Sequence, residues 1–311
     1  MRHHAPPMQQ RRRAEIQIIA AALLFSTGGA AIKACTLSSW QVASFRSGIA
    51  AAVILLLVPA ARRGWSWRTV LVGAIYSLPI ILFVLANKLT TAANAIFLQS
   101  TAPLYILLLG PWLLREPIQR RDIPIMGLAA VGLTMFFVGI QSPQATAPDP
   151  LRGNILAVLA GVSWALTIVG LRWLGRAQNP NSEIRNPTEL PEAKSKSTDS
   201  TIAAVAVGNL IACGVALPWA LPVTNSTPID WVVIAFLGVF QIGMAYVFLS
   251  RGIGHVTALE ASLLLMVEPV FNPIWALLIH GEEPGAWALA GGLLILGATV
   301  LKNVGREPPS T

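Results

Sequence analysis

Long apolar stretches alternate with short polar segments along the whole chain. A bilayer core of about 30 Å needs about 20 mostly apolar residues per helix, and ten stretches reach roughly that length. Strands that do not close into a barrel leave backbone groups unpaired in lipid, and the ten-residue alternation of a membrane barrel is missing from the sequence. The pattern therefore predicts an all-α integral membrane protein with ten transmembrane helices. These are predicted over 15–33, 40–59, 67–86, 91–113, 123–141, 151–174, 201–221, 229–250, 257–280 and 285–302.

The composition agrees with this pattern. Of the 311 residues, 54% are hydrophobic and 12% are charged, and the mean hydropathy is +0.63. A soluble chain carries about 25% charged residues, so the composition excludes a cytosolic enzyme and a disordered protein. With two cysteines, it also excludes a secreted disulfide scaffold. The net charge of +8 is spread between the apolar runs, and we therefore expect no nucleic-acid partner.

The lysines and arginines predict the orientation in the membrane. If the N-terminus is inside, all but four of the 22 basic residues fall in cytoplasmic segments. The exceptions are Lys33, Lys88 and Arg152 outside, and Arg46 within a span. Cytoplasmic loops carry the excess of basic residues. We therefore expect a multi-pass protein of the cell's inner or plasma membrane with both termini cytoplasmic.

The two halves of the chain resemble each other at a constant offset of 166 residues. Five spans per half is an odd number, so the second half must enter the membrane with opposite polarity. Inverted repeats of this kind are typical of secondary transporters. The offset relates Thr91 to Thr257, Ala95 to Ala261, Pro103 to Pro269 and Glu116 to Glu282.

This repeat predicts how the chain is divided. Residues 175–200 are polar and lack apolar periodicity, which predicts a disordered cytoplasmic loop inside the second half. The predicted parts are a basic cytoplasmic tail (1–14), a first repeat (15–141), an external linker (142–150), a second repeat (151–304) and a cytoplasmic tail (305–311).

Three groups of residues carry a resemblance to a known family. They are Arg46 within Val-Ala-Ser-Phe-Arg-Ser-Gly, the segment from Ser100-Thr-Ala-Pro to Leu-Arg-Glu116, and the segment from Glu268-Pro to His-Gly-Glu282. In these features the chain resembles the EamA-like branch of the drug/metabolite transporter superfamily, ten-helix permeases built of two five-helix repeats. The resemblance implies transport of a small metabolite such as an amino acid, frequently outward, and does not identify the substrate. The chain departs from the pattern in its long loop after the sixth span, and Asn209 stands roughly where the first half has Arg46.

Prolines near the centres of two related spans predict helix breaks. Pro103 and Pro269 each remove a helical hydrogen bond and clash with a carbonyl four residues back, that of Gln99 or Leu265. Carbonyl groups freed at this depth need hydrogen-bond donors from neighbouring protein or from a water-filled cavity. A pair of such breaks at equivalent positions of the two halves indicates a transporter's binding site. Pro273 adds a second break in the ninth span. The alternative is that these prolines only kink their helices.

Two charged residues lie deep in the predicted spans. A carboxylate such as Glu268 near the bilayer centre costs at least about 2.5–3.5 kcal/mol. It would suit proton coupling, a cationic substrate group or a neutral structural acid. Arg46 keeps its charge and could bind a substrate carboxylate, pair with Glu268 or form a structural ion pair. Further candidates for lining a substrate cavity are Gln99, Asn209, Gln241, Tyr246, Asn272, Trp164 and Trp275.

The leading hypothesis is a secondary-active permease for a small organic solute that works by alternating access between the repeats. One alternative is a flippase or exporter for lipids, amphiphiles or drugs. A membrane enzyme acting on lipid-linked substrates would need acids or histidines clustered at one membrane face, and here the acids are scattered.

Phosphate-binding glycine loops, nucleophile motifs and metal-ligand clusters are missing from the sequence, so we expect no enzymatic activity, no cofactor and no metal. The expected partners are the substrate and the lipid bilayer. Proton coupling is a hypothesis, and the oligomeric state is open.

Overall fold

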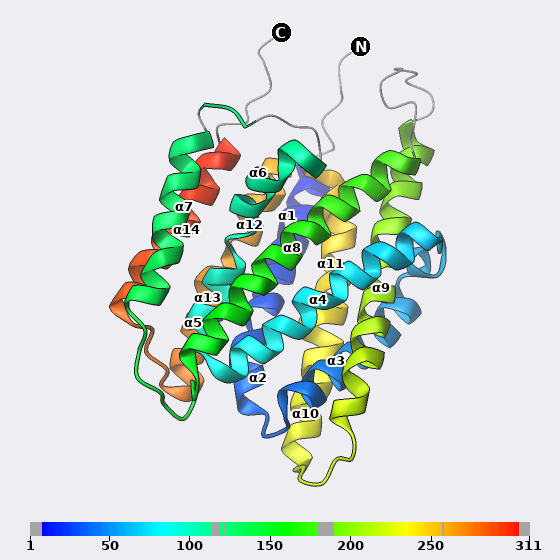
Figure 1. Cartoon of the computed structure of the whole chain (residues 1–311). Helices are drawn as coiled ribbons and strands as arrows, with labels where there is room; N and C mark the ends of the chain where they lie inside the picture. The colour runs from blue at the N-terminus through cyan, green and yellow to red at the C-terminus, as the bar shows by residue number, and fades with distance from the viewer. Residues whose placement is uncertain (1–7, 114–117, 121, 179–189, 257, 305–311) are drawn as a thin grey trace.

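A computed structural model describes residues 8–113, 118–120, 122–178, 190–256 and 258–304. These residues form helices joined by short connections, and a single bridge between Gln144 and Ala147 is the one β-type pairing found among them. The helices run largely along one direction and form an elongated bundle (Figure 1). The first half contains α1 (Met8–Ser26), α2 (Gly28–Ala34), α3 (Ser39–Leu57), η1 (Pro59–Arg62), α4 (Trp67–Leu89), α5 (Ala92–Gln99), α6 (Ala102–Leu113) and α7 (Asp122–Val138).

The second half repeats this plan with more interruptions. It contains α8 (Pro150–Gln178), α9 (Leu190–Ala220), α10 (Pro228–Phe236), the π-helix η2 (Leu237–Met244), α11 (Ala245–Gly252), η3 (Ile253–His255), α12 (Ala258–Leu265), α13 (Val267–His280) and α14 (Ala286–Val304). Eight helical segments of the described chain are long and apolar enough to cross a membrane. Two shorter apolar helices, Asp122–Val138 and Ala286–Lys302, stand where the fifth and tenth spans are predicted. The prediction of an all-α membrane protein is confirmed.

The polar loop predicted over residues 175–200 is shorter than expected. Helix α8 continues to Gln178 and α9 already begins at Leu190, so the described parts of this segment are helical rather than disordered. The segment 190–200 contains good helix formers such as Glu192, Ala193 and Lys194. Adding turns to an existing helix avoids the cost of nucleating a new one. Residues 179–189 lie outside the described residues, as do Glu116 and Thr257 of the repeat motif.

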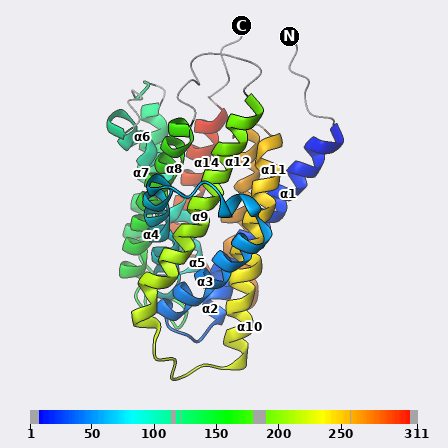
Figure 2. The ribbon, with the colours of Figure 1, turned by 90° about the vertical axis from the view of Figure 1, so that its right-hand side faces the viewer.

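The two halves are interleaved rather than side by side. Helix α8 of the second half packs on α4 and α5 of the first half, and α1 packs in the equivalent way on α11 and α13. Corresponding helices also pair directly, α3 with α9 and α7 with α14 (Figures 1 and 2). At the α7–α14 contact, a Cβ atom on Gly132 would lie 2.7 Å from the Gly291 carbonyl oxygen. Small residues thus allow the close helix approach that membrane packing requires.

Several spans are interrupted near their middle. The first span breaks at Thr27, the fourth between Gln99 and Ala102, and the ninth at Met266, while the eighth contains the π-helix η2. Helices α5 and α12 end at Gln99 and Leu265, four residues before Pro103 and Pro269, where a proline ring clashes with the helix. Pro273 lies inside α13, which continues past it to His280.

Candidate functional site

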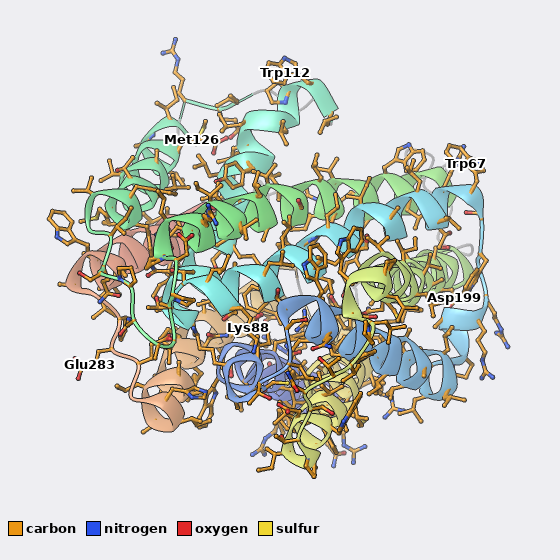
Figure 3. All side chains as sticks on the ribbon, turned by 60° about the horizontal axis from the view of Figure 1, so that its bottom comes forward. Trp67, Lys88, Trp112, Met126, Asp199 and Glu283 are labelled. Atoms are coloured by element: carbon orange, nitrogen blue, oxygen red, sulfur yellow. The ribbon has the colours of Figure 1, made fainter. Side chains whose placement is uncertain are left out.

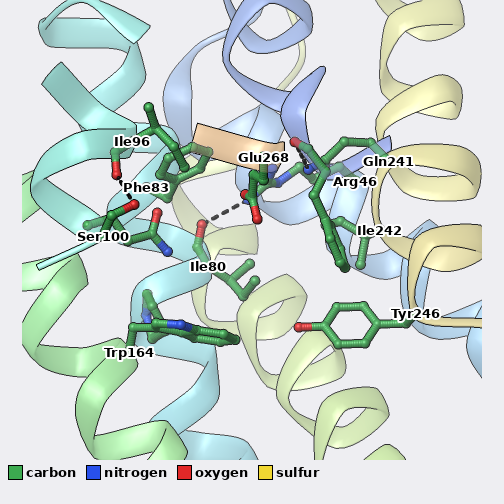
Figure 4. A pocket seen from close by; sticks show the side chains of 13 residues that line it. Arg46, Ile80, Phe83, Ile96, Ser100, Trp164, Gln241, Ile242, Tyr246 and Glu268 are labelled. Carbon is green, nitrogen blue, oxygen red and sulfur yellow. Dashed lines mark hydrogen bonds between the residues drawn. The ribbon is translucent and has the colours of Figure 1, made fainter. Parts of the chain in front are cut away.

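A cavity of about 150 Å³ lies where these interruptions meet. Its walls come from both halves of the chain, as expected for a site at the interface between inverted repeats. Six of the predicted site residues line it: Arg46, Gln99, Trp164, Gln241, Tyr246 and Glu268 (Figure 4).

Local helix geometry places several of these side chains at the cavity. Gln99 is the last residue of α5, and Glu268 is the second residue of α13, directly after the break at Met266. Gln241 lies within η2, and π-helical turns are frequent at functional sites because they reorient side chains. Its amide Nε2 donates to the Phe25 carbonyl at 3.4 Å. Its Oε1 is buried without a hydrogen-bond partner, which leaves an acceptor free for a ligand.

Arg46 is buried, with 1% of its surface exposed. One terminal guanidinium nitrogen donates to the Ile80 carbonyl at 3.0 Å, and Nε is buried without a partner. A guanidinium carries five N–H donors, and an uncompensated buried charge is strongly destabilising. The surroundings of Arg46 therefore favour an anionic group in the cavity.

Glu268 and Arg46 line the same cavity, and their side chains lie close together (Figure 4). Among the ion pairs found in the described part of the chain, none joins these two side chains. Glu268 lies in the first turn of α13, where the helix dipole favours a carboxylate. The cavity is thus lined by one basic and one acidic side chain, which form no ion pair with each other.

Tyr76 contacts residues of this candidate site, and the sequence analysis did not select it. It is 1% exposed, and its hydroxyl donates to that of Tyr246 at 2.9 Å. Its ring lies 6.1 Å from that of Trp164. Tyr76 therefore contacts both Tyr246 and Trp164, two aromatic residues that line the cavity, and helps to position them. A tyrosine inside an apolar span was the only signal in the sequence.

Three predicted cavity residues lie elsewhere. Asn209 is fully buried in α9 and donates to the Val205 carbonyl at 2.9 Å. Trp275 donates from its indole to the Ser26 hydroxyl at 2.9 Å and lines a separate apolar groove. Asn272 is fully buried, and neither polar atom of its amide has a hydrogen-bond partner. It lies one turn beyond Glu268, where α13 already packs against α2 and α5.

At the end of the bundle that carries the 142–150 linker, called the outer end here, buried polar contacts join the ends of three helices. Lys33 and Glu282 form an ion pair with 2.9 Å between Nζ and Oε2, and their side chains are 3% and 1% exposed. Lys33 also donates to the carbonyls of Thr90 at 2.8 Å and Thr146 at 2.5 Å, and Glu282 accepts from the Ala92 amide at 2.6 Å. These contacts hold together the ends of α2, α5 and α13.

Residues 12–138 and 193–304 match the sequence model of the EamA-like transporter family. The chain belongs to this family. The resemblance inferred from Arg46 and the two proline–glutamate segments is therefore confirmed, and so is the prediction of a membrane transporter. This EamA-like chain is therefore a multi-pass integral membrane protein.

Two curated relatives and one solved structure are similar to this EamA-like transporter. The chain is 25% identical over 291 residues to the pseudopaline exporter CntI of Pseudomonas aeruginosa, in strains UCBPP-PA14 and PAO1. The match covers 91% of this chain and 93% of the relative. A crystal structure at 18% identity matches with a TM-score of 0.56 over 94% of this chain and 96% of that one. At that identity, the match to the crystal structure shows the shared fold alone.

Proposed function

We propose that this chain is a secondary-active exporter of a small organic metabolite that works by alternating access. The observation that carries the proposal is a cavity between the helix breaks that is lined by Arg46 and Glu268, two side chains that form no ion pair with each other. Charged residues inside a membrane are costly and mark substrate or ion pathways. The similarity to the pseudopaline exporter supports outward transport of a metabolite.

The chemistry of the cavity suggests the kind of solute. Arg46 would bind a carboxylate through its free N–H donors, and Glu268 would accept an amine or a coupled proton. Trp164 and Phe83 add apolar walls. A small organic acid that also carries an amine, such as an amino acid, satisfies both charged residues at once.

We infer that the contacts around Lys33 and Glu282 close the outer end and that this end opens in one half of the cycle. The segments that close it are the short half-helices α2 and α5 together with α13, and each begins or ends at a break near the cavity. Such breaks allow an outer half-helix to move while its inner half stays packed. The inner end, which carries most of the basic residues, would face the cytoplasm in the inner or plasma membrane. No catalytic step is part of this cycle.

Uptake by proteoliposomes tests the proposal. Purified protein is assayed with amino acids, nucleosides, sugars and drugs, with and without an imposed pH gradient. We expect transport of a carboxylate-bearing solute, reduced more than about tenfold in Arg46→Gln because a buried charged contact is worth about 2–5 kcal/mol. Arg152→Gln is the matched control, since the Arg152 side chain is 79% exposed and is not part of the cavity lining. Wild-type transport in Arg46→Gln, or transport of none of these solutes by the unmodified protein, would contradict the proposal.

One feature favours the alternative of amphiphile transport. An apolar groove of about 380 Å³ between α2, α10 and α13 is lined by Ala30, Val233, Trp275 and neighbouring side chains. The groove would face lipid in a membrane, and it is separate from the charged cavity. Translocation of fluorescent lipids in the same proteoliposomes would distinguish this function, and Trp275→Ala should then alter it.

A further inference from the structure

Arg68 lies beside two tryptophans at the inner end of the bundle. Its guanidinium carbon is 5.6 Å from the centre of the Trp67 ring and 5.4 Å from that of the Trp173 ring. The two rings contact each other edge-on at 5.8 Å and come from different helices, α4 and α8. Cation–π contacts of this kind restrict the guanidinium and keep its charge.

The arginine of this cluster has an unsatisfied donor. The Nε atom of Arg68 is buried and has no hydrogen-bond partner. No ion pair found in the described part of the chain includes Arg68. Arg68 also lies in the first turn of α4, where a cation opposes the helix dipole. An anion bound at this position would satisfy the donors and offset the unfavourable charge.

The surroundings are basic and interfacial. Arg62 and Arg63 are exposed in the turn before α4, and Arg172 is half-buried on α8. One acidic residue of the neighbouring helix α9 is Asp199, and Figure 3 shows it near the same side of the molecule as Trp67. Three further arginines thus lie on the elements next to the cluster.

The cluster also has the character of a membrane interface. Trp67 is 67% exposed and Trp173 is 38% exposed, as in the aromatic belts of membrane proteins. Val70 and Leu71, within the next turn of α4, are exposed apolar side chains that would contact acyl chains.

We propose that Arg68, Trp67 and Trp173 form a binding site for the phosphate headgroup of an anionic phospholipid. The guanidinium fork matches two phosphate oxygens, and basic pockets between helices at the cytoplasmic face bind anionic lipid headgroups. The lipid tail would lie along α4 and α8. This site is distinct from the transport cavity, and the inference stands whichever solute is transported.

Native mass spectrometry of the purified full-length protein tests this site. The protein is exchanged into detergent with equal amounts of phosphatidylglycerol and phosphatidylcholine of identical acyl chains. We expect preferential retention of phosphatidylglycerol, reduced about fivefold in Arg68→Gln, as one arginine near a membrane surface is worth about 1 kcal/mol. Arg120→Gln, which changes an exposed arginine between α6 and α7, is the matched control and should leave retention unchanged.

A second variant keeps the test decisive if Arg68→Gln folds poorly. Trp173→Leu preserves the charge but removes one of the two rings, and it should also weaken retention. Inorganic phosphate added alone should not compete, because the tail contributes to binding. Equal retention of the two lipids by the unmodified protein, or wild-type retention in both variants, would overturn the proposal. Competition by free phosphate would also overturn it, since the site would then bind the soluble anion.

Discussion

Loss of the buried Lys33–Glu282 ion pair should change which side of the protein the cavity opens to. Lys33→Met keeps most of the side-chain length and removes the charge. The Glu282 carboxylate would then stay buried with the Ala92 amide as its remaining hydrogen-bond donor among the described contacts. Opening the outer end would bring water to this carboxylate. The substitution should therefore destabilise the closed state relative to an outward-open state.

The size of the expected shift between the two states follows from the burial of the Lys33 and Glu282 side chains. The two side chains are 3% and 1% exposed, and removing one partner of a buried ion pair costs about 3–5 kcal/mol. If the open state regains most of that energy through hydration, the equilibrium shifts by about two orders of magnitude, because each 1.4 kcal/mol is tenfold.

The native Cys35 reports on this opening. It follows α2 directly, is 2% exposed, and its carbonyl accepts a hydrogen bond from Lys88. Burial raises the pKa of the Cys35 thiol to about 11 in the closed state. Opening gives the labelling reagent access to the Cys35 thiol and lowers the pKa of this thiol towards its ordinary value of about 8.5. Both changes speed the reaction, the second because it increases the fraction of reactive thiolate. In a Cys213→Ser background, a membrane-impermeant methanethiosulfonate should label Lys33→Met at least about tenfold faster than the parent.

Two control variants distinguish the loss of the Lys33–Glu282 ion pair from a general destabilisation of the protein. Arg152→Met breaks an exposed pair with Asp149 at 3.2 Å, worth at most about 1 kcal/mol, and should leave labelling unchanged. The double variant Lys33→Met/Glu282→Gln removes the unpaired charge, so it should label more slowly than Lys33→Met alone. Parental labelling in Lys33→Met, or a double variant that labels as fast as the single one, would refute the reasoning.

Two further predictions concern the cavity and the helix breaks. Glu268→Gln keeps the shape of the side chain but fixes its neutral form. The variant should still exchange substrate in proteoliposomes but should fail to accumulate it against a gradient. Unchanged accumulation driven by a pH gradient would eliminate a proton-carrier role for Glu268. Pro103→Ala and Pro269→Ala should each favour a continuous helix across the break, and we expect folded protein by circular dichroism with slower transport. Wild-type rates in both proline variants would show that the breaks serve packing alone.

Local and periodic features could be predicted from the sequence. The spans follow from apolar runs that match the bilayer thickness, a constraint that acts on each segment separately. The interruptions before Pro103 and Pro269 follow from a clash between a ring and a carbonyl four residues away. The repeat follows from matching residues at a constant offset. The π-helix over Leu237–Met244 could not be predicted, because a shift in hydrogen-bond register inside an apolar run depends on how its neighbours pack.

Contacts between distant segments were decided by the tertiary structure. Arg46 and Glu268 lie in the same cavity without forming an ion pair, whereas Lys33 pairs with Glu282. Asn272 and Trp275 lie on the same helix as Glu268 but outside the cavity. Composition and periodicity indicate that a charged residue inside a membrane needs a partner or water. Which of the two it finds depends on how the interleaved repeats pack, because residues far apart in the chain meet only once that packing has formed.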